Sequence, residues 1–313
     1  MKIISKTTKI DFLSKSRRRI ALMISALLVT ASLVSLATRG LEFGIDFTGG
    51  ILLEVGYPQA ADLEQIRGNL DAEGFSDAQV QRFGRDTDVL VRLPPQPGAE
   101  ADAVRARLQQ VLQAGGDVID LRRVEFVSAQ VGSELAERGA LALVIALLMI
   151  FMYVMIRFQW KFSAGAVAAL AHDAIVTVGF FSFFHFPFDL TVVAAVLAVI
   201  GYSLNDTVVA FDRIRENFFT LRGVTAEEAM NISINEMLAR TLITGLTTLL
   251  VLAALLVLGG ESIAPFSIAL IVGIVVGTYS SIYTASATAL ELNVNAQDLI
   301  EPVKDPTLID DLP

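Results

Sequence analysis

The sequence predicts an α-helical polytopic membrane protein with six transmembrane helices and an inserted α+β domain of the ferredoxin-like type. The mean hydropathy of +0.60 is too high for an ordinary soluble domain. A membrane-spanning helix needs about 20 mostly apolar residues. Six segments meet this need: 20–38, 139–156, 163–184, 190–211, 241–258 and 266–288. A long stretch of mixed character separates the first two and predicts the inserted domain.

The inserted stretch, residues 39–138, alternates between strand and helix patterns. Strands are predicted at 51–57, 78–84, 88–93 and 117–130, and helices at 61–74 and 100–116. Leu63, Ile66 and Leu70 share one face of the first helix, and Arg85–Thr87 is predicted to form the turn between the middle strands. The order β-α-β-β-α-β is that of the ferredoxin-like fold. Because this stretch contains no histidine and no ligand cluster, we expect a docking surface rather than a catalytic site.

Basic residues predict which loops face the cytoplasm. Residues 1–38 carry seven Lys or Arg against one Asp, and the loops at 157–162 and 212–240 are also basic. The loops at 185–189 and 259–265 contain neither Lys nor Arg. We therefore expect an N-terminal tail (1–19) and an acidic C-terminal tail (289–313) in the cytoplasm, and residues 39–138 in the periplasm.

The segment 212–240 is predicted to be a cytoplasmic amphipathic connector between the fourth and fifth spans, within a membrane region of 139–288. Thr225 and Glu228 have the spacing of a helix capping box. Arg213 and Arg215 would face lipid head groups while Phe218 and Phe219 lie at the membrane interface. A simple solvated connector is an equally good interpretation.

Composition excludes several functional classes. The net charge is −9, and residues 39–138 hold ten Arg against seventeen Asp and Glu, which argues against nucleic acid as a partner. The chain has no cysteine, so it cannot form a disulfide, a thiolate zinc site or an iron–sulfur site by itself. We expect no catalytic residues, no cofactor and no bound metal, hence not an enzyme.

Polar residues inside the predicted spans are the candidate site. Asn205 and Asp206 lie before the end of the fourth span, His172 and Asp173 lie within the third, and Arg240 opens the fifth. Charged groups within a membrane are costly and usually functional. We predict that Asp206, Arg240 and Asp173 form a proton-coupling group, supported by the polar side chains of Asn205, Thr244 and His172. The alternatives are a buried ion pair that only fixes helix packing and, for His172, an interhelical hydrogen bond.

Gly273 and Gly277 in the sixth span have the small-xxx-small spacing that allows close helix packing. The six spans have charged residues in their interior as well as this small-residue face. We therefore predict a heteromer with a second six-span protein, in which the two halves close around the Asp206 region.

Three segments carry a resemblance to a known family. They are Gly44-Ile-Asp46-Phe-Thr-Gly49-Gly50, the run from Gly201 through Asp206 into Asp212-Arg213-Ile-Arg215-Glu216-Asn217, and Arg240-Thr-Leu-Ile-Thr244. Together they resemble the SecF family of bacterial SecD–SecF proteins, whose subunits resemble half of an RND-type transporter. The resemblance covers nearly the whole chain.

The resemblance implies a role in protein translocation across the bacterial inner membrane. It implies SecD as the partner in a heteromer, the SecYEG translocon with preprotein substrates, and YajC and YidC as further partners. The proton motive force would drive export after the step powered by SecA and ATP. The family's intramembrane acid corresponds to Asp206 and its arginine to Arg240.

Three rival functions remain at this point. A small-molecule secondary transporter would need broken helices around a polar cavity at the midplane, and this sequence shows no ring of polar residues. An RND-class exporter would normally be a longer chain with twelve spans. A passive scaffold would tolerate replacement of Asp206 and Arg240.

Overall fold

The computed structural model describes residues 9–96, 101–113, 119–260 and 263–295. Within these residues, six helices are long and apolar enough to cross a membrane, which confirms the predicted spans and makes the chain a multi-pass membrane protein. They are α1 (Lys15–Arg39), α5 (Ala129–Arg157), α6 (Trp160–Phe184), α7 (Leu190–Thr220), α8 (Ala226–Leu258) and α9 (Ala264–Ser280). The last continues through a π-helical turn, η2 (Ser281–Ala285), into α10 (Ser286–Glu291). Residues 1–8 and 296–313 of the predicted tails lie outside the described residues.

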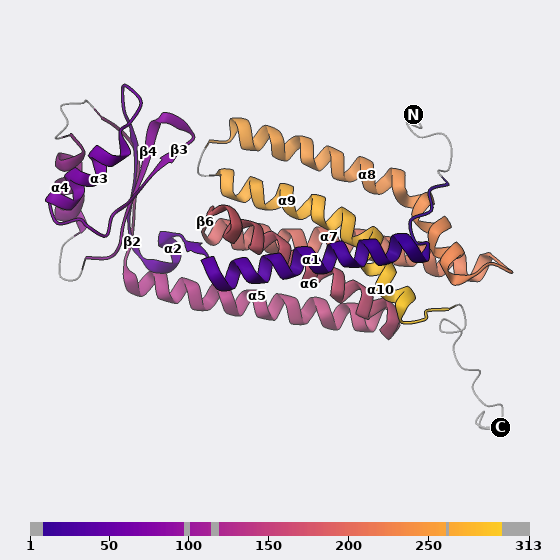
Figure 1. Cartoon of the computed structure of the whole chain (residues 1–313). Helices are drawn as coiled ribbons and strands as arrows, with labels where there is room; N and C mark the ends of the chain where they lie inside the picture. The colour runs from indigo at the N-terminus through magenta and orange to yellow at the C-terminus, as the bar shows by residue number, and fades with distance from the viewer. Residues whose placement is uncertain (1–8, 97–100, 114–118, 261–262, 296–313) are drawn as a thin grey trace, which may run out of the picture.

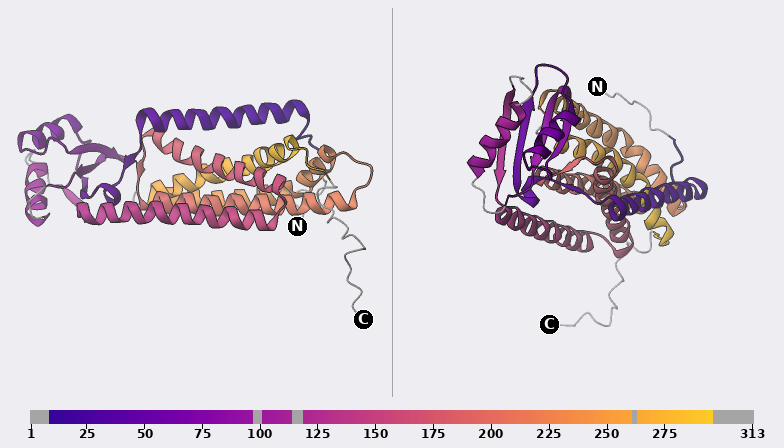
Figure 2. Two further views of the ribbon diagram at one scale, coloured as in Figure 1. Left: turned by 90° about the horizontal axis from the view of Figure 1, so that it is seen from below. Right: turned by 60° about the vertical axis from the view of Figure 1, so that its left-hand side comes forward.

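The six helices run alternately up and down a bundle that carries a small sheet at one end (Figures 1 and 2). We call this the sheet end and the opposite end the distal end. The turns between α5 and α6 and between α7 and α8 lie at the distal end, where α1 begins. These are the basic segments of the sequence, so the predicted basic loops lie together at one end of the molecule.

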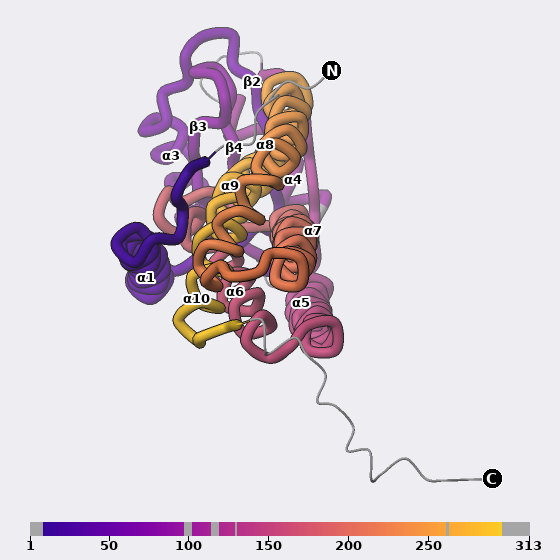
Figure 3. The backbone as a smooth tube through the Cα atoms, turned by 90° about the vertical axis from the view of Figure 1, so that its right-hand side faces the viewer, coloured from indigo at the N-terminus to yellow at the C-terminus, as the bar shows by residue number. Residues whose placement is uncertain are grey.

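The bundle is packed around three helices. We compare an 18-residue apolar stretch in each helix. Half of these residues are buried in α6 and 39% in each of α7 and the α9–α10 helix, but only 6% are buried in α5 and 11% in α8. Seen along the bundle, α1 and α5 lie at opposite margins with α6 between them (Figure 3). The faces of α5 and α8 are therefore free to meet lipid or another protein.

The sheet unit between α1 and α5 has four antiparallel strands in the order β3-β4-β2-β5. Its elements follow the chain as β2 (Gly50–Gly56), α3 (Leu63–Ala72), β3 (Gln79–Phe83), β4 (Arg85–Leu93), α4 (Ala101–Gln113) and β5 (Asp120–Val127). Before them come a short strand β1 (Glu42–Phe43) and a single helical turn α2 (Ile45–Thr48). The order of these main elements is β-α-β-β-α-β.

Alternation along the strands divides the sheet into two apolar faces. Ile51, Leu53 and Val55 of β2 point toward α3 and α4, where they pack with Ile66 and Leu70 in one buried cluster. The intervening Leu52 points to the other face, where a smaller cluster includes Ile45 of α2. The sheet is thus covered by α3 and α4 on one face and by the α2 turn on the other.

Two predicted boundaries of the sheet unit differ from the structure. The turn after β3 is at Gly84, whose φ of 76° is in the left-handed region that glycine tolerates, so Arg85–Thr87 belong to β4. The last strand ends at Val127, because Ser128 caps α5 by accepting a hydrogen bond from the backbone of Val131.

The predicted connector at 212–240 consists mainly of helix. α7 continues to Thr220, and α8 begins at Ala226, so only a short turn joins them. The predicted capping box is confirmed: Thr225 accepts from the Glu228 amide at 3.2 Å, and Glu228 accepts from the Thr225 amide at 2.9 Å. Phe218 is buried rather than interfacial, whereas Phe219 is exposed.

Candidate functional site

Asp173 lies at a fully buried junction of three membrane-spanning helices. Its Oδ2 accepts hydrogen bonds from the hydroxyls of Ser203 on α7 and Ser280 on α9, the latter at 2.7 Å. Its Oδ1 lies 3.0 Å from Nδ1 of the neighbouring His172. His172 is 3% exposed, and its other ring nitrogen, Nε2, is buried without a partner in the described residues. The predicted polar pair in the third span is therefore the centre of a hydrogen-bonded network.

The π-helical turn η2 places a second hydroxyl pair next to this network. A π-helical turn holds one extra residue, and such turns are frequent at functional sites. Here the adjacent Ser280 and Ser281 both face the bundle interior. Ser281 accepts a hydrogen bond from Thr207 on α7 at 3.1 Å and donates to the carbonyl of Gly277 at 2.8 Å. The Thr207–Ser281 pair therefore lies beside the Asp173 cluster, and Ser281 approaches the backbone carbonyl of Ser203 at 3.5 Å.

Asp206 lies at the edge of the bundle rather than in its centre. The residue is half-buried on α7, and its Oδ2 is buried with no hydrogen-bond partner in the described part of the chain. Arg240 of α8 interacts electrostatically with this carboxylate, but the described residues contain no ion pair between the two. Asp206 and Arg240 are therefore close enough to interact, as predicted, but they do not form a direct ion pair in the described residues.

Arg240 begins a polar stripe on the outer face of α8. Arg240, Thr244 and Thr247 are exposed, as is Asn205 on the neighbouring α7. The two threonine hydroxyls donate to carbonyls of their own helix, Thr244 to Arg240 at 2.9 Å and Thr247 to Ile243 at 2.9 Å. A polar face at this depth of a membrane is costly to leave against lipid. The geometry therefore leaves a face suited to a second protein.

The predicted small-xxx-small face serves close helix packing, as expected, and it does so within the chain. A Cβ added at Gly273 would lie 2.1 Å from Val199 Cγ2, and one at Gly277 would lie 3.2 Å from Ser203 Cβ. Both glycines therefore bring α9 against α7 of the same chain. This face is not available for a partner.

The segment from Gly44 to Gly50 joins the sheet to the bundle. Asp46 Oδ2 accepts a hydrogen bond from the Leu190 amide at 3.0 Å, so it satisfies one of the free amides at the start of α7. Gly49 and Gly50 have φ values of 71° and 122°, which favour glycine. A Cβ at Gly50 would lie 2.3 Å from the Leu93 carbonyl oxygen. These residues of the predicted family motif hold a tight junction between β2, β4 and α7.

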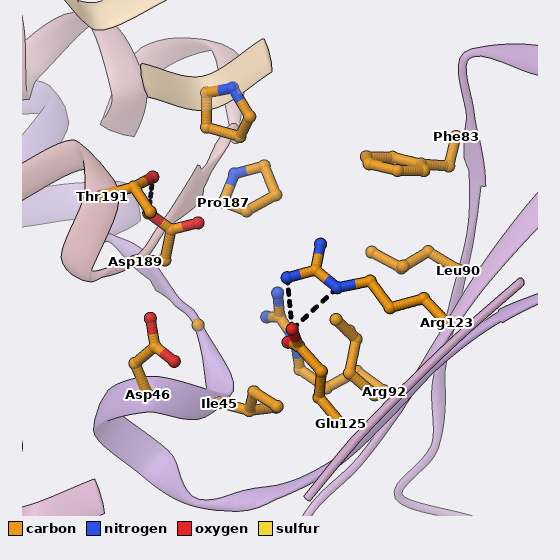
Figure 4. A pocket seen from close by; sticks show the side chains of 13 residues that line it. Ile45, Asp46, Phe83, Leu90, Arg92, Arg123, Glu125, Pro187, Asp189 and Thr191 are labelled. Carbon is orange, nitrogen blue, oxygen red and sulfur yellow. Dashed lines mark hydrogen bonds and ion pairs between the residues drawn. The ribbon is translucent and has the colours of Figure 1, made fainter. Parts of the chain in front are cut away.

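A cavity of about 220 Å³ lies at this junction, between the sheet and the first turn of α7 (Figure 4). Arg92 of β4 lines it and donates to the Phe43 carbonyl at 2.9 Å. Burial lowers the pKa of its guanidinium, an effect that the charges of Glu42, Asp189 and Asp46 oppose. Short strands also pair here, β1 with β6 (Pro187–Phe188). The junction therefore contains charged groups, and no hydrogen bond within the described residues links them to Asp173 and its partners.

The remaining motif residues form ion pairs at the distal end. Asp212 pairs with Arg157 at the end of α5, with 2.5 Å between its Oδ1 and the guanidinium. Arg213 pairs with Glu216 one turn along α7 and with Glu236 on α8, at 2.5 and 2.7 Å. These contacts hold the helix ends together, and Arg215 is exposed beside them.

The structure brings together residues that the sequence treatment did not single out. Ser203 and Ser280 donate to Asp173, and Thr207 pairs with Ser281 beside them. A possible signal was the Ser280-Ser281 pair, because an ordinary α-helix would not turn two adjacent residues equally toward one neighbour.

Comparison with known proteins identifies the family. Residues 107–295 match the family described as protein export membrane protein SecD/SecF, C-terminal, and residues 34–61 match the SecD/SecF GG motif. The second match contains Gly49 and Gly50.

Curated relatives cover nearly the whole chain. Protein translocase subunit SecF of Pseudomonas aeruginosa is 49% identical over 296 residues, which are 95% of this chain and 96% of that protein. The subunit of the same name from Escherichia coli O157:H7 is 43% identical over 89% of this chain and 87% of its own length.

A solved structure shares the architecture. The crystal structure of SecDF from Thermus thermophilus, described as a translocon-associated membrane protein, matches 94% of this chain with a TM-score of 0.84 and 34% identity. This chain spans 40% of that SecDF chain. A second SecDF structure, in a super-membrane-facing form, matches with a TM-score of 0.65. Since the family matches and the SecF relatives extend over almost the entire sequence, this chain belongs to the SecF family of SecD/SecF protein export membrane proteins.

Proposed function

We propose that this chain is the SecF-type half of a SecD–SecF complex that uses proton movement to promote preprotein export. It would act after the SecA- and ATP-driven step at SecYEG, with YajC and YidC as further partners. One observation carries the coupling part of this proposal. Asp206, in a membrane-spanning helix, keeps a buried carboxylate oxygen without a hydrogen-bond partner among the described residues.

An unpaired carboxylate within the membrane is suited to bind and release a proton. Its charged form is destabilised by the surroundings and is favoured by a nearby cation, here Arg240. Protonation would remove the attraction between the two side chains and change the packing of α7 beside α8. Each proton that crosses 100 mV releases about 2.3 kcal/mol from the electrical gradient, which is enough to shift a two-state packing change.

Asp173 is the second titratable group in this proposal. It shares its oxygens with two serine hydroxyls and His172, and Ser203 lies one turn from Thr207 on α7. Hydroxyls can both accept and donate a proton within a hydrogen-bonded chain. We assign Asp173 and these hydroxyls to the inner part of the proton path, and Asp206 to the part that faces the partner.

A second protein would cover the exposed polar stripe of α8 and the neighbouring Asn205. SecD is the proposed partner, because the matching SecDF chain is more than twice as long as this one. Such cover would take Arg240 and Thr244 out of contact with lipid and close the Asp206 region.

The orientation is also proposed. The sheet unit would lie in the periplasm as a ferredoxin-like domain, and the basic distal end would face the cytoplasm of the bacterial inner membrane. The absence of native cysteine permits a clean test. Cysteine introduced at the exposed Gln110 of α4 should react with an impermeant thiol reagent in intact spheroplasts, and cysteine at Thr220 should react only after lysis. The reverse pattern would invert the topology.

The proton-coupling proposal is tested with Asp206→Asn. Asparagine keeps the size of the side chain but cannot bind and release a proton. Insertion and partner association should persist, while gradient-dependent stimulation of preprotein export should be lost. Asp71→Asn, at an exposed position on α3, is the matched control and should export normally.

Export must be compared at equal amounts of assembled complex. Full gradient-dependent export by Asp206→Asn would refute the coupling role and fit the passive-scaffold alternative, which tolerates this replacement. Loss of export in step with loss of complex would instead mean that Asp206 is needed for packing.

A further inference from the structure

A cavity of about 220 Å³ opens at the distal end, between the turn that joins α5 to α6 and the last turns of α7. It plays no part in the proposed proton path. Its lining combines apolar and cationic side chains: Ile156, Arg157, Phe158, Gln159, Phe162, Phe211 and Arg215. This combination raises the question of what occupies it.

The floor of the cavity is aromatic. Phe211 of α7 packs edge-on against Phe162 and Phe158, with ring centroids 5.0 and 5.8 Å apart. Phe162 and Phe211 are almost fully buried. A rigid apolar floor of this kind offers no hydrogen-bond partner to a polar ligand, so any polar recognition must come from the rim.

The rim carries a net positive charge. Arg157 lies over the Phe158 ring, 4.9 Å from its centroid, and pairs with Asp212, which balances its charge. Arg215 is exposed and has no ion-pair partner among the described residues, so its charge is uncompensated. The position therefore favours an anion.

The membrane side of the cavity continues as an apolar ridge. Ile156, Met152 and Leu148 follow one another at four-residue spacing along α5 and are 81, 58 and 61% exposed. Trp160, at the start of α6, is 59% exposed, as is typical of aromatic residues at the membrane–water interface. The cation thus lies at the membrane surface, and the ridge descends from it into the hydrocarbon region.

We propose that this cavity binds the phosphate head group of an anionic phospholipid, with one acyl chain along the ridge of Leu148, Met152 and Ile156. Arg215 is the principal contact to the phosphate, and Arg157 can share its guanidinium between Asp212 and the lipid. Basic pockets between transmembrane helices are suited to anionic head groups. A free phosphate would meet the same rim but would gain nothing from the ridge. The ridge favours the lipid, and this inference does not depend on the proton path.

The test is a lipid titration of the purified full-length chain, followed by native mass spectrometry. Phosphatidylglycerol should bind more tightly than phosphatidylcholine, which has the same phosphate but no net charge. Arg215→Gln should weaken binding of phosphatidylglycerol about fivefold, the effect of one arginine near a charged membrane surface. Arg215→Lys should retain most of the affinity. Arg222→Gln removes another exposed arginine, outside the cavity lining, and is the matched control.

Three outcomes would overturn the proposal. Equal affinity for the two lipids would mean that the head-group charge is not recognised. An equal loss in Arg222→Gln would mean general electrostatic attraction rather than a site. Displacement of the lipid by inorganic phosphate at matched concentration would make the ligand a soluble phosphate instead.

Discussion

Close packing of α9 against α7 at Gly273 should make this position intolerant of even one added methyl group. A Cβ at Gly273 would lie 2.1 Å from Val199 Cγ2, 2.6 Å from Cγ1 and 2.9 Å from Cβ. Carbon atoms in contact are normally about 3.5–4.0 Å apart, so the helices must separate by roughly 1 Å or Val199 must move. Val199 is 1% exposed and has little space in which to move. Overpacking of this kind costs about 1–3 kcal/mol, which is the loss we expect for Gly273→Ala.

A double-mutant cycle isolates the contact. Val199→Ala removes the two closest atoms and alone should cost about 1–2 kcal/mol through lost packing. Combined with Gly273→Ala, it should restore space for the new methyl group, so the double variant should be more stable than the sum of the single changes by at least about 1 kcal/mol. The matched control is Gly201→Ala on α7, where an added Cβ would meet nothing within 4 Å. Its stability should be unchanged or raised by about 0.5–1 kcal/mol.

Unfolding of the purified chain in detergent, followed by circular dichroism, measures all four variants. Wild-type stability in Gly273→Ala would refute the close approach of the helices. Additive losses in the double variant would show that Val199 is not the obstacle.

Other predictions concern the sheet unit and the helix ends. Burial of Asp88 disfavours its ionised form, but hydrogen bonds from Arg122 and Thr87 outweigh this and hold its pKa below the ordinary value. Its contribution to stability should be complete above about pH 4 and lost as the pH falls through the folded-state pKa, and a pH series on Asp88→Asn should lack this dependence. Asp46→Ala should lower the free energy of unfolding by about 1 kcal/mol, because the Leu190 amide loses its acceptor. Asp46→Asn keeps an acceptor oxygen and should retain most of this stability. Equal losses in the two variants would exclude the hydrogen bond as the cause. Thr225→Ala should cost about 0.5–2 kcal/mol in the same assay, and Thr225→Ser should be close to wild type; no difference between the two would mean that the cap contributes little.

Much of the fold was predictable because apolar length and strand alternation are local signals. The six spans follow from runs of about 20 apolar residues, and the capping box at Thr225 follows from spacing alone. The turn between β3 and β4 was misplaced because Arg85–Thr87 are polar, as turn residues often are. In the structure the chain turns at Gly84 alone, whose φ is in the left-handed region. The early start of α5 was missed because residues 129–138 mix polar and apolar side chains and precede the continuous apolar run.

The candidate site was predictable in its ionisable residues but not in their connections. Asp206, Asp173 and Arg240 stand out because charges are rare in apolar helices. Their side-chain directions depend on how the helices rotate against one another, which the sequence does not encode locally. Arg240 therefore faces outward instead of pairing with Asp206, and the π-helical turn that buries both Ser280 and Ser281 has no short sequence signature.

The hydrogen bond from the Leu190 amide to Asp46 joins the start of α7 to α2, the turn that leads into strand β2 of the sheet. Sixteen residues separate Leu190 from Asp206, which is about 24 Å along an α-helix. A tilt of only 10° about a pivot at Asp206 would carry Leu190 through roughly 4 Å, whereas a hydrogen bond tolerates a change of about 0.5 Å. A tilt of α7 must therefore either break this hydrogen bond or move α2 together with the helix. In the second case the paired strands β1 and β6, which lie beside the bond, would move as well.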